Sequence, residues 1–425
     1  MTDASEARRV IADLKELKER TGTERGAQRV AWGPVWRDAR AWFREKVAEI
    51  GLPVEADAAG NLWVTLPGAS VDPAQAKRTI VMGSHLDCVP SGGWLDGCFG
   101  VVLGLEVLRQ FAKAPEKAPI TLKLVDWADE EGARFGRSLF GSAAAAGTLK
   151  LEDVRALKDR QGVRLVDALQ ENGVDLERAL EAHEHFRAID LRAYLEAHIE
   201  QGPVLEAMGK GTGVVIGTFG VERHMIRFQG QAAHSGSTPI SMRRDAFLAA
   251  AETALACREI AKRHSKPGAG VVCTVGVVDV EPKFVTAIPG VCQISLDQRA
   301  LDPDTLALMY RDAREASERI ARENDVEVAW TRLLRIEPRP FDPRLLELCA
   351  EAVREETGEA PHLPSGALHD ASEMAALVPV VMMFSSSSRG LSHCKEEDTP
   401  EPHLESTIHA FLRLVRKTVA HVAAG

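Results

Sequence analysis

The sequence predicts an α/β protein in which a smaller α+β domain is inserted into a larger domain. The length supports two domains, because 425 residues exceed the roughly 250–300 residues that one hydrophobic core usually serves. Strand-like and helical patterns alternate up to about residue 209, which is typical of a sheet with helices on its faces. We therefore expect residues 1–209 and 331–425 to form the larger domain and residues 210–330 to form the inserted one.

The elements of the larger domain follow from local patterns. Apolar and β-branched runs predict strands, whereas apolar residues spaced three and four apart predict helices. Residues 1–20 have the pattern of an amphipathic helix, residues 149–191 that of charged connecting helices, and the glycine-rich segment GKGTG at 209–213 predicts a hinge. The further expected strands are 61–66, 79–82, 120–125, a strand that ends in 196–201, and 378–384; the further helices are 35–50, 101–111, 343–355 and 404–422.

The inserted domain has a different order of elements. Its sequence predicts a strand, a strand, a helix, two more strands, a helix and a final strand, which is typical of a compact α+β domain. The expected elements are 214–217, 224–228, 246–263, 271–280, 291–296, 305–322 and 326–330.

Composition narrows the possible functions. The formal net charge is −10, so the sequence offers no basic patch for nucleic acid or an anionic membrane. No stretch reaches the roughly 18 apolar residues of a membrane span, and the N-terminus lacks a signal-peptide pattern, so we expect a cytoplasmic protein. Seven cysteines without a CxxC pair predict reduced thiols, of which Cys88, Cys98 and Cys394 lie near the motifs described next.

Two polar residues follow the predicted strand TIVM. A catalytic metal pair needs imidazole nitrogens, carboxylate oxygens and one bridging carboxylate. In GSHLD, His85 and Asp87 lie two positions apart, so we expect His85 to bind a metal and the Asp87 side chain to hold its imidazole. The alternatives are a structural histidine and an ordinary turn aspartate.

Acidic residues provide further candidates. Asp96 lies in the glycine-rich turn SGGWLDG, where its carboxylate would reach two metals; a simple Asp-Gly turn is the alternative. The strand LKLVDWADEEG ends with Asp129, Glu130 and Glu131, a costly run of like charges unless cations or a proton compensate for it. Different roles would explain the run, with Glu131 as a ligand and Glu130 as general base. A solvated acidic face is the alternative, although the run ends an apolar strand.

Two histidines complete the set of candidate ligands. EAHIEQGP supplies His198 and GLSHCKEEDT supplies His393, with ordinary loop histidines as the alternative. The serine run at 385–388 lacks a G-x-S-x-G elbow and predicts a loop before the second histidine. The candidate ligands are therefore His85, Asp96, Glu131, His198 and His393.

These motifs resemble those of the hydantoinase/carbamoylase family of metal-dependent amidases. That family comprises N-carbamoyl-L-amino acid hydrolases, β-ureidopropionases and allantoate amidohydrolases, within the wider aminoacylase and carboxypeptidase-like metallopeptidases. Six segments occur in the family's order over nearly the whole chain: GSHLDCVPSGGWLDG, DEEGARFGRSLFGS, LEAHIEQGPVLE, AAHSGSTPISMRRDA, PSGALHDA and GLSH. The resemblance implies a mixed-sheet dinuclear metallohydrolase domain with an inserted lid or dimerisation domain, and a homodimer.

The resemblance also implies a role for each matching residue. Two divalent metals would be held, one by His85, Asp96 and His198, the other by Asp96, Glu131 and His393; zinc, manganese, cobalt and nickel all suit such ligands. Glu130 matches the general base, and His234 in AAHSG matches the group that stabilises the oxyanion. The matching substrate contacts are Gln201, His234, Thr286, Arg299 and Gly366, with Arg299 gripping the substrate carboxylate.

Several of these residues have simpler alternatives. For Gln201 the alternative is a structural hydrogen bond, for His234 a turn contact with Ser235 and Ser237, and for Arg299 an ion pair with Asp297 or Asp302. Two residues depart from the family pattern: Thr286 in TAIPG replaces the usual Asn and loses its amide group, and Leu368 in PSGALHDA replaces a usual Gly. These departures concern the identity of the substrate more than the type of reaction.

The expected reaction is hydrolysis of the carbamoyl C–N bond of an N-carbamoyl-L-amino acid. Hydroxide formed at the two metals would attack, with Glu130 as general base. Allantoate or β-ureidopropionate hydrolysis would use the same groups, and aminoacylase or dipeptidase activity would differ in the acyl group. The alternative outside catalysis is a metal-free binding scaffold, against which the complete ligand set and Glu130 argue.

Overall fold

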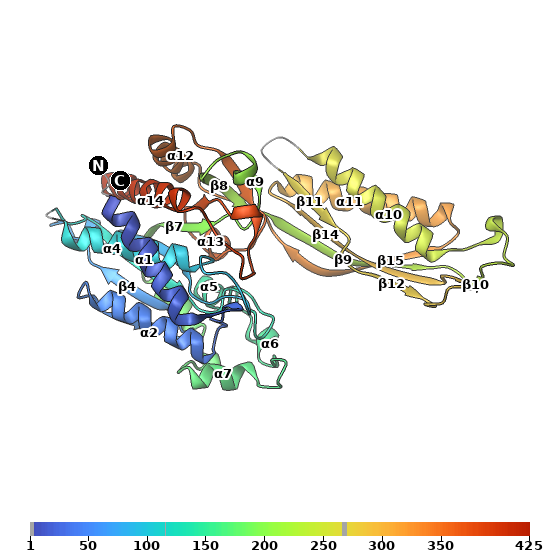
Figure 1. Ribbon diagram of the computed structural model, residues 1–425, viewed down its shortest axis with the longest axis horizontal. Helices are drawn as coiled ribbons and strands as arrows, with labels where there is room; N and C mark the ends of the chain where they lie inside the picture. The colour runs from blue at the N-terminus through green and yellow to red at the C-terminus, as the bar shows by residue number, and fades with distance from the viewer. Residues whose placement is uncertain (1–3, 115, 266–269) are drawn as a thin grey trace. The chain divides into compact units, whose positions relative to one another are not determined.

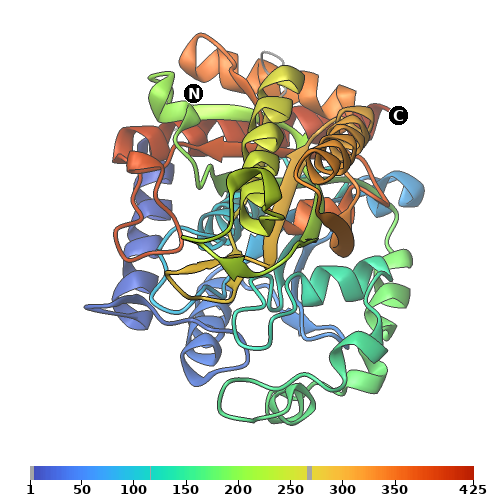
Figure 2. The same cartoon turned by 90° about the vertical axis from the view of Figure 1, so that its right-hand side faces the viewer.

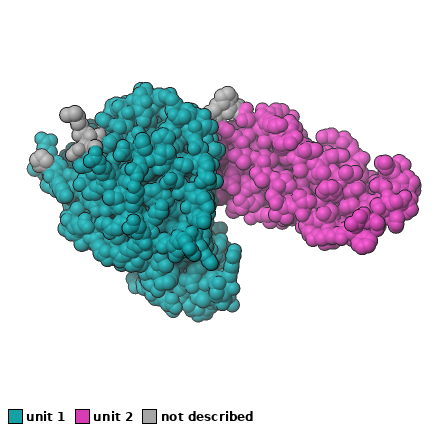
Figure 3. All heavy atoms as spheres, in the orientation of Figure 1, with its two compact units in different colours: residues 1–216, 341–363, 367–425 teal, residues 217–340, 364–366 magenta. Residues whose placement is uncertain are grey.

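The computed structural model describes residues 4–114, 116–265 and 270–425, so the first three residues of the expected N-terminal helix lie outside the described residues. The chain divides into two compact units (Figure 3). Unit 1 comprises residues 1–216, 341–363 and 367–425, and unit 2 comprises residues 217–340 and 364–366. The chain therefore crosses into unit 2 after residue 216 and returns after residue 340, later than the expected crossings at 209 and 330.

A mixed sheet forms the centre of unit 1, which confirms the predicted α/β class (Figure 1). Within the described residues it has nine strands in the order β16-β8-β18-β7-β5-β6-β4-β3, with β17 beside β8. The four central strands β18, β7, β5 and β6 run parallel; β8 pairs antiparallel with β18, and β4 pairs antiparallel with β6. The bounds are β3 Val54–Ala56, β4 Leu62–Leu66, β5 Thr79–His85, β6 Thr121–Trp127, β7 Leu191–Ile199, β8 Thr212–Thr218, β16 Arg339–Pro340, β17 His362–Ser365 and β18 Val380–Ser385.

The glycine-rich segment predicted as a hinge is part of this sheet. Gly213 belongs to β8 and pairs with Phe384 of β18, and the carbonyl of Gly211 accepts a hydrogen bond from the backbone N–H of Ser386. Residues 211–216 are therefore fixed inside unit 1, and the hinge prediction for 209–213 does not coincide with either crossing between the units.

Helices cover both faces of the sheet in unit 1. One face carries α1, α2, α4, α12 and α14, and the other carries α5, α8 and α13. A hairpin of β1 (Gly22–Thr23) and β2 (Gly26–Ala27) follows the first helix. The helices are α1 Ala4–Thr21, α2 Pro34–Ala48, α3 Pro73–Lys77, α4 Cys98–Lys113, α5 Phe140–Ala146, α6 Leu151–Val154, α7 Leu165–Glu171, α8 Glu181–Arg187, α9 Val204–Ala207, α12 Pro343–Thr357, α13 Asp370–Met374 and α14 Glu401–Ala424.

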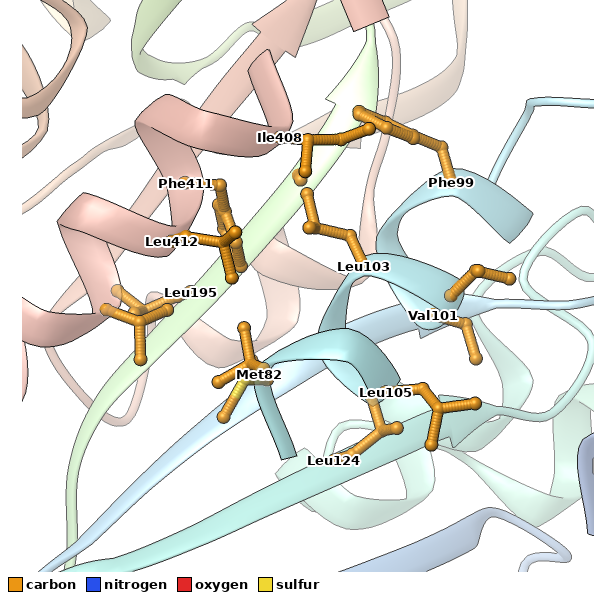
Figure 4. Packing of buried hydrophobic residues seen from close by; sticks show 14 of the residues in the cluster. Met82, Phe99, Val101, Leu103, Leu105, Leu124, Leu195, Ile408, Phe411 and Leu412 are labelled. Atoms are coloured by element: carbon orange, nitrogen blue, oxygen red, sulfur yellow. The ribbon is translucent and has the colours of Figure 1, made fainter. Parts of the chain in front are cut away.

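The central strands are rich in apolar residues because both of their faces are covered. On β5, Ile80 and Met82 pack on the face with α4 and α14, whereas Val81 packs on the opposite face. Figure 4 shows the first of these interfaces, where side chains of α4 and α14 meet those of β5, β6 and β7. The labelled residues are Met82, Phe99, Val101, Leu103, Leu105, Leu124, Leu195, Ile408, Phe411 and Leu412. This buried sheet provides a rigid base for the side chains that follow its strands.

Unit 2 is an antiparallel sheet with two long helices, α10 and α11, packed side by side on it (Figure 2). Its described strands have the order β11-β14-β9-β15, with β12 beside β14. The expected strand 271–280 is in fact two strands, because the backbone N–H groups of Gly276 and Val277 turn away to the Ser295 hydroxyl. The bounds are β9 Gly220–Gln229, β10 Ala233–His234, α10 Ala246–His264, β11 Val271–Thr274, β12 Val278–Glu281, β13 Ala287–Ile288, β14 Val291–Ala300, α11 Pro303–Glu323 and β15 Glu327–Ile336.

The buried histidine of unit 2 should make its stability depend on pH. The ring of His224 stacks on Tyr310, with centroids 4.8 Å apart, and Glu222 Oε2 lies 3.5 Å from its Nε2. Burial, together with Arg332 and Arg314, lowers the pKa of His224 from 6.5 to about 4. Between these values the unfolded chain binds more protons than the folded one, so stability is lost as the pH falls from about 6.5 to about 4.

We expect the substitution His224→Gln to remove about 1–3 kcal/mol of this pH dependence. The measurement is the free energy of unfolding by denaturant at pH 7 and at pH 4.5, in parent and variant. The exposed His362, replaced in the same way, is the control and should leave the difference unchanged. An equal pH dependence in parent and His224→Gln would contradict a buried, neutral ring.

Candidate metal centre

The five candidate ligands lie at one edge of the sheet in unit 1. His85 is the last residue of β5, His198 is the penultimate residue of β7, and Glu131 follows β6. Asp96 lies two residues before α4, and His393 lies in the loop that follows β18. Because parallel strands end at the same edge, residues far apart in the sequence meet there.

The first group of donors consists of His85, Asp96 and His198, whose donor atoms all lie within 4.8 Å of one another. All three side chains are buried. His198 Nδ1 lies 2.8 Å from the carbonyl of Ile199, which accepts its proton and leaves the Nε2 lone pair of the neutral ring on the other side. That Nε2 lies 3.2 Å from Asp96 Oδ1 without hydrogen-bonding geometry.

The negative charge of Asp96 favours a cation in this group. Burial lowers the pKa of His198, but the adjacent Asp96 carboxylate more than offsets this and raises the pKa to about 9. Burial lowers the pKa of His85 to about 4, which keeps its imidazole neutral, as a metal ligand must be. A divalent ion between Asp96 and His198 would take the place of the proton that His198 binds and would find nitrogen and oxygen ligands of the usual kind.

The second group of donors consists of Asp96, Glu131 and His393, again within 4.8 Å of one another. His393 Nε2 lies 3.1 Å from Asp96 Oδ2 and 3.4 Å from Glu131 Oε2. Asp96 thus faces the first group with Oδ1 and the second with Oδ2, the position of a bridging carboxylate. The second group is less enclosed, because the His393 side chain is 49% exposed.

Glu130 belongs to neither group but lies beside the first. Its side chain is buried, and its Oε2 lies 3.7 Å from His85 Nε2. Burial, reinforced by Asp370 and Glu131, raises the pKa of Glu130 well above its ordinary value. A carboxyl group whose pKa is raised is suited to take up a proton and hold it, as a general base must.

Asp87 supports the site differently from the prediction. The His85 Nδ1 proton is accepted by the backbone carbonyl of Asp87 at 3.1 Å, whereas the carboxylate is 3.6 Å away. The carboxylate instead accepts hydrogen bonds from the backbone N–H groups of Glu130 and Glu131, at 3.2 and 3.1 Å. Its side chain therefore fixes the segment after β6, and only its backbone orients the imidazole.

Gln201 lies at the second group. Its Nε2 donates to Asp96 Oδ2 at 3.0 Å and lies 3.2 Å from His393 Nε2. Its backbone N–H donates to the Ser387 hydroxyl at 3.0 Å. The structural hydrogen bond considered as the alternative is thus present, and contact with a substrate stays a prediction.

The other predicted substrate contacts lie in unit 2. Arg299 Nε pairs with Asp297 Oδ1 at 2.8 Å, the alternative expected for it, and one terminal nitrogen of its guanidinium donates to the carbonyl of Gly366 at 2.7 Å. His234 Nδ1 accepts hydrogen bonds from the backbone N–H groups of Gly236 and Ser237, so the proton of the neutral ring is on Nε2.

Thr286 lies next to His234 within unit 2. Its carbonyl accepts the backbone N–H of Ser235 at 2.9 Å. His234 ends β10, and Thr286 directly precedes β13, which pairs with β10. A role in binding substrate stays a prediction for these four residues of unit 2, namely His234, Thr286, Arg299 and Gly366.

Sequence reasoning missed several buried residues around the ligands. His369 lies with its ring centroid 4.5 Å from that of His198, and Glu196, His198 and His369 form a third group of possible donors. The signal for His369 was its place in the motif PSGALHDA, directly after Leu368. The signal for Glu196 was its place at the start of EAHIEQGP, two positions before His198, because an acidic residue within a buried strand is unusual.

Two buried arginines hold the segment after β5. Arg40 Nε lies 2.7 Å from Asp126 Oδ2, and Asp126 Oδ1 accepts the backbone N–H of Leu86 at 2.9 Å. Arg29 Nε donates to the carbonyl of the same leucine at 2.9 Å. These cations fix the backbone that follows His85 and offset part of the buried acidic charge.

The cysteines near the motifs belong to none of the donor groups found among the described residues. All seven cysteines lie among the described residues and are free, as expected. Burial raises the pKa of the Cys88 and Cys98 thiols to about 12. Among the described residues, no helix is long and apolar enough to cross a membrane.

Comparison with known proteins identifies the family. The model of peptidase family M20/M25/M40 matches residues 81–417. An N-carbamoyl-L-amino acid amidohydrolase of Geobacillus stearothermophilus is 34% identical over 373 residues, 88% of each chain. An allantoate amidohydrolase of Bacillus subtilis is 30% identical over 395 residues, 92% of each chain.

Solved structures are similar over the full length. An amidase of the hydantoinase/carbamoylase family from Burkholderia multivorans has a TM-score of 0.86 and 32% identity, covering 99% of this chain and 98% of its own. Fold and sequence therefore define the class, a hydrolase of peptidase family M20/M25/M40. Within that class the chain belongs to the hydantoinase/carbamoylase family of amidases, which confirms the resemblance. It is an amide hydrolase, and enzymes of the family depend on metal ions.

Proposed function

We propose that this enzyme hydrolyses the carbamoyl C–N bond of an N-carbamoyl-L-amino acid with two divalent metals. His85, Asp96 and His198 would hold one metal, and Asp96, Glu131 and His393 the other. The observation that carries the proposal is the pair of donor groups that share Asp96 and lie beside the free carboxyl group of Glu130. The 34% identity to the Geobacillus amidohydrolase supports the carbamoyl substrate.

The residues of the chain have distinct tasks in the reaction. When bound, the two cations lower the pKa of water and polarise the carbonyl oxygen. Glu130 takes a proton from the attacking water and passes it to the nitrogen that leaves as the carbamoyl C–N bond breaks. The products are the free amino acid, ammonia and carbon dioxide. Glu130 can hold this proton between the two steps because its pKa is raised.

Residues of unit 2 would bind the substrate and its developing charge. His234 carries its proton on Nε2, since its Nδ1 accepts two backbone N–H groups, and Nε2 is thus the atom that would donate to the oxyanion. Arg299 would bind the carboxylate of the amino acid. Its guanidinium is already held by Asp297 and Gly366, which limits the loss of side-chain entropy when a substrate binds.

We expect His234→Ala to lower kcat by roughly 10²- to 10³-fold, the usual loss when one oxyanion donor is removed. The metal content should stay that of the parent, because His234 belongs to neither donor group. Steady-state kinetics and metal analysis of the same preparation measure both quantities, with the exposed His362→Ala as control. A kcat within roughly threefold of the parent's would exclude this role for His234.

The test of the proposal is a panel of substrates. Metal-free enzyme reconstituted with zinc, manganese, cobalt or nickel is assayed with N-carbamoyl-L-amino acids, allantoate, β-ureidopropionate and N-acetyl-L-amino acids, following ammonia and amino-acid release in parallel. We expect the highest kcat/KM for an N-carbamoyl-L-amino acid. Turnover confined to N-acetyl compounds would overturn the proposal, and a higher kcat/KM for allantoate would move the assignment to the activity named for the Bacillus subtilis relative.

A further inference from the structure

We propose that Glu397 is a positioning residue for the second donor group. It would hold Asp96 and His393 in place by linking the loop that carries His393 to the turn that carries Asp96. This inference deepens the proposed function and rests on it. It concerns a residue that belongs to neither donor group and that sequence reasoning did not single out.

The contacts of the Glu397 carboxylate define the tie. Its Oε1 accepts the backbone N–H groups of Leu95 and Asp96, both at 3.0 Å. Its Oε2 accepts the hydroxyl proton of Ser392, the residue before His393, at 2.7 Å. One carboxylate, 2% exposed, thus holds both the backbone of the bridging aspartate and the neighbour of the outermost histidine.

The turn is shaped to receive this carboxylate. Gly93 packs directly against it, and a Cβ at that position would overlap the carboxyl group of Glu397. The Ser392 hydroxyl also lies 3.4 Å from the Nε2 of Gln201, which itself donates to Asp96 Oδ2. The contact between the two loops is therefore close and hydrogen-bonded on both sides.

The two donor groups depend on this tie to different degrees. His85 and His198 lie on neighbouring parallel strands, β5 and β7, whose pairing and burial fix them independently. His393 lies in a loop, is 49% exposed, and has a positive φ of 57° that a histidine adopts only at a cost. Loss of Glu397 should therefore weaken the second group and leave the first largely intact.

The conservative replacement should preserve the tie. In Glu397→Gln the amide oxygen still accepts both backbone N–H groups, and the amide nitrogen can donate to the Ser392 oxygen. In Glu397→Ala all three contacts are lost. The variant Ser392→Ala keeps both backbone contacts of Glu397 and removes the serine hydroxyl, with its contacts to Glu397, Gln201 and Asp96, so it tests the tie even if Glu397→Ala folds poorly. Glu396→Gln, at the exposed neighbouring position, is the matched control.

Metal binding tests the inference directly. Metal-free protein is titrated with Zn²⁺ by calorimetry, with Co²⁺ absorption as a second readout, and the melting temperature of the metal-free protein is recorded. We expect two equivalents for the parent, Glu396→Gln and Glu397→Gln. In Glu397→Ala and Ser392→Ala we expect one equivalent of parental affinity and a second weakened by roughly 10- to 100-fold, and in Ser392→Ala an almost unchanged melting temperature.

The possible outcomes separate the two proposals. A parent that binds fewer than two equivalents overturns the proposed function. A parent with two equivalents whose Glu397→Ala and Ser392→Ala variants bind both with unchanged affinity overturns only the role of Glu397. Equal weakening of both equivalents in these variants overturns it as well, because a general structural role would act on the first group too.

Discussion

Replacement of Glu130 by glutamine is expected to lower kcat by roughly 10²- to 10⁴-fold while leaving the metal content unchanged. Glutamine has the same shape but cannot accept and return a proton. The carboxylate of Glu130 belongs to neither donor group, so neither group should lose a ligand in this variant. The measurement combines kcat for the preferred substrate with metal analysis of the same sample.

The preceding residue supplies the matched control for this variant. Asp129 is also buried, but its Oδ2 accepts the indole N–H of Trp32 at 2.7 Å, and an amide oxygen can accept the same proton. Asparagine also tolerates the positive φ of 58° at this position. We expect Asp129→Asn to keep kcat within roughly threefold to tenfold of the parent's. An equal loss in both variants would assign Glu130 to structure and not to proton transfer.

Replacement of Asp96 by asparagine is expected to have the larger effect on metal binding. Asp96 faces His198 with one oxygen and His393 with the other, so both positions lose the shared negative ligand. We expect fewer than one tightly bound equivalent, and a kcat lower by about 10³-fold or more, since the metal contribution to the transition state amounts to several kcal/mol. Calorimetric titration of the metal-free protein gives the stoichiometry.

Removal of a ligand that belongs to just one donor group provides the comparison for Asp96→Asn. His393→Ala affects the second group alone, so one equivalent should remain, while the exposed Asp398→Asn should retain both. If Asp96→Asn also retained one tight equivalent, the aspartate would serve a single metal, and the proposal of a shared carboxylate would be wrong.

Much of the fold could be predicted because its local signals agree with its tertiary structure. The apolar runs that become β5, β6 and β18 are buried on both faces, and helices α11 and α12 each begin where an Asp-Pro pair places an N-cap before a proline. The hinge predicted from the glycine-rich segment 209–213 does not coincide with a crossing between the units. Glycine also occurs where a strand packs closely against its neighbours. Gly213 shows this, since a Cβ there would overlap Leu363 and Leu205.

The candidate site could be predicted in part for a similar reason. The sequence of a strand end shows which residues could bind a metal, and the five candidate ligands do meet at one edge of the sheet. It does not show which atom of a residue makes a contact, so the Asp87 side chain was assigned to His85 while it in fact holds the backbone of Glu130 and Glu131. Glu397 and Leu95 are 302 positions apart, and no local pattern reveals such a contact.

The place of β18 in the sheet has a consequence for how the protein is made. This strand lies between β7 and β8, but it is encoded after the whole of unit 2. While the ribosome is still translating unit 2, β7 and β8 have emerged with unpaired backbone edges that can join the wrong partner. Fragments truncated before residue 380 should therefore aggregate or recruit chaperones, and the candidate metal centre can be completed only after His393, its last ligand in the sequence, has been translated.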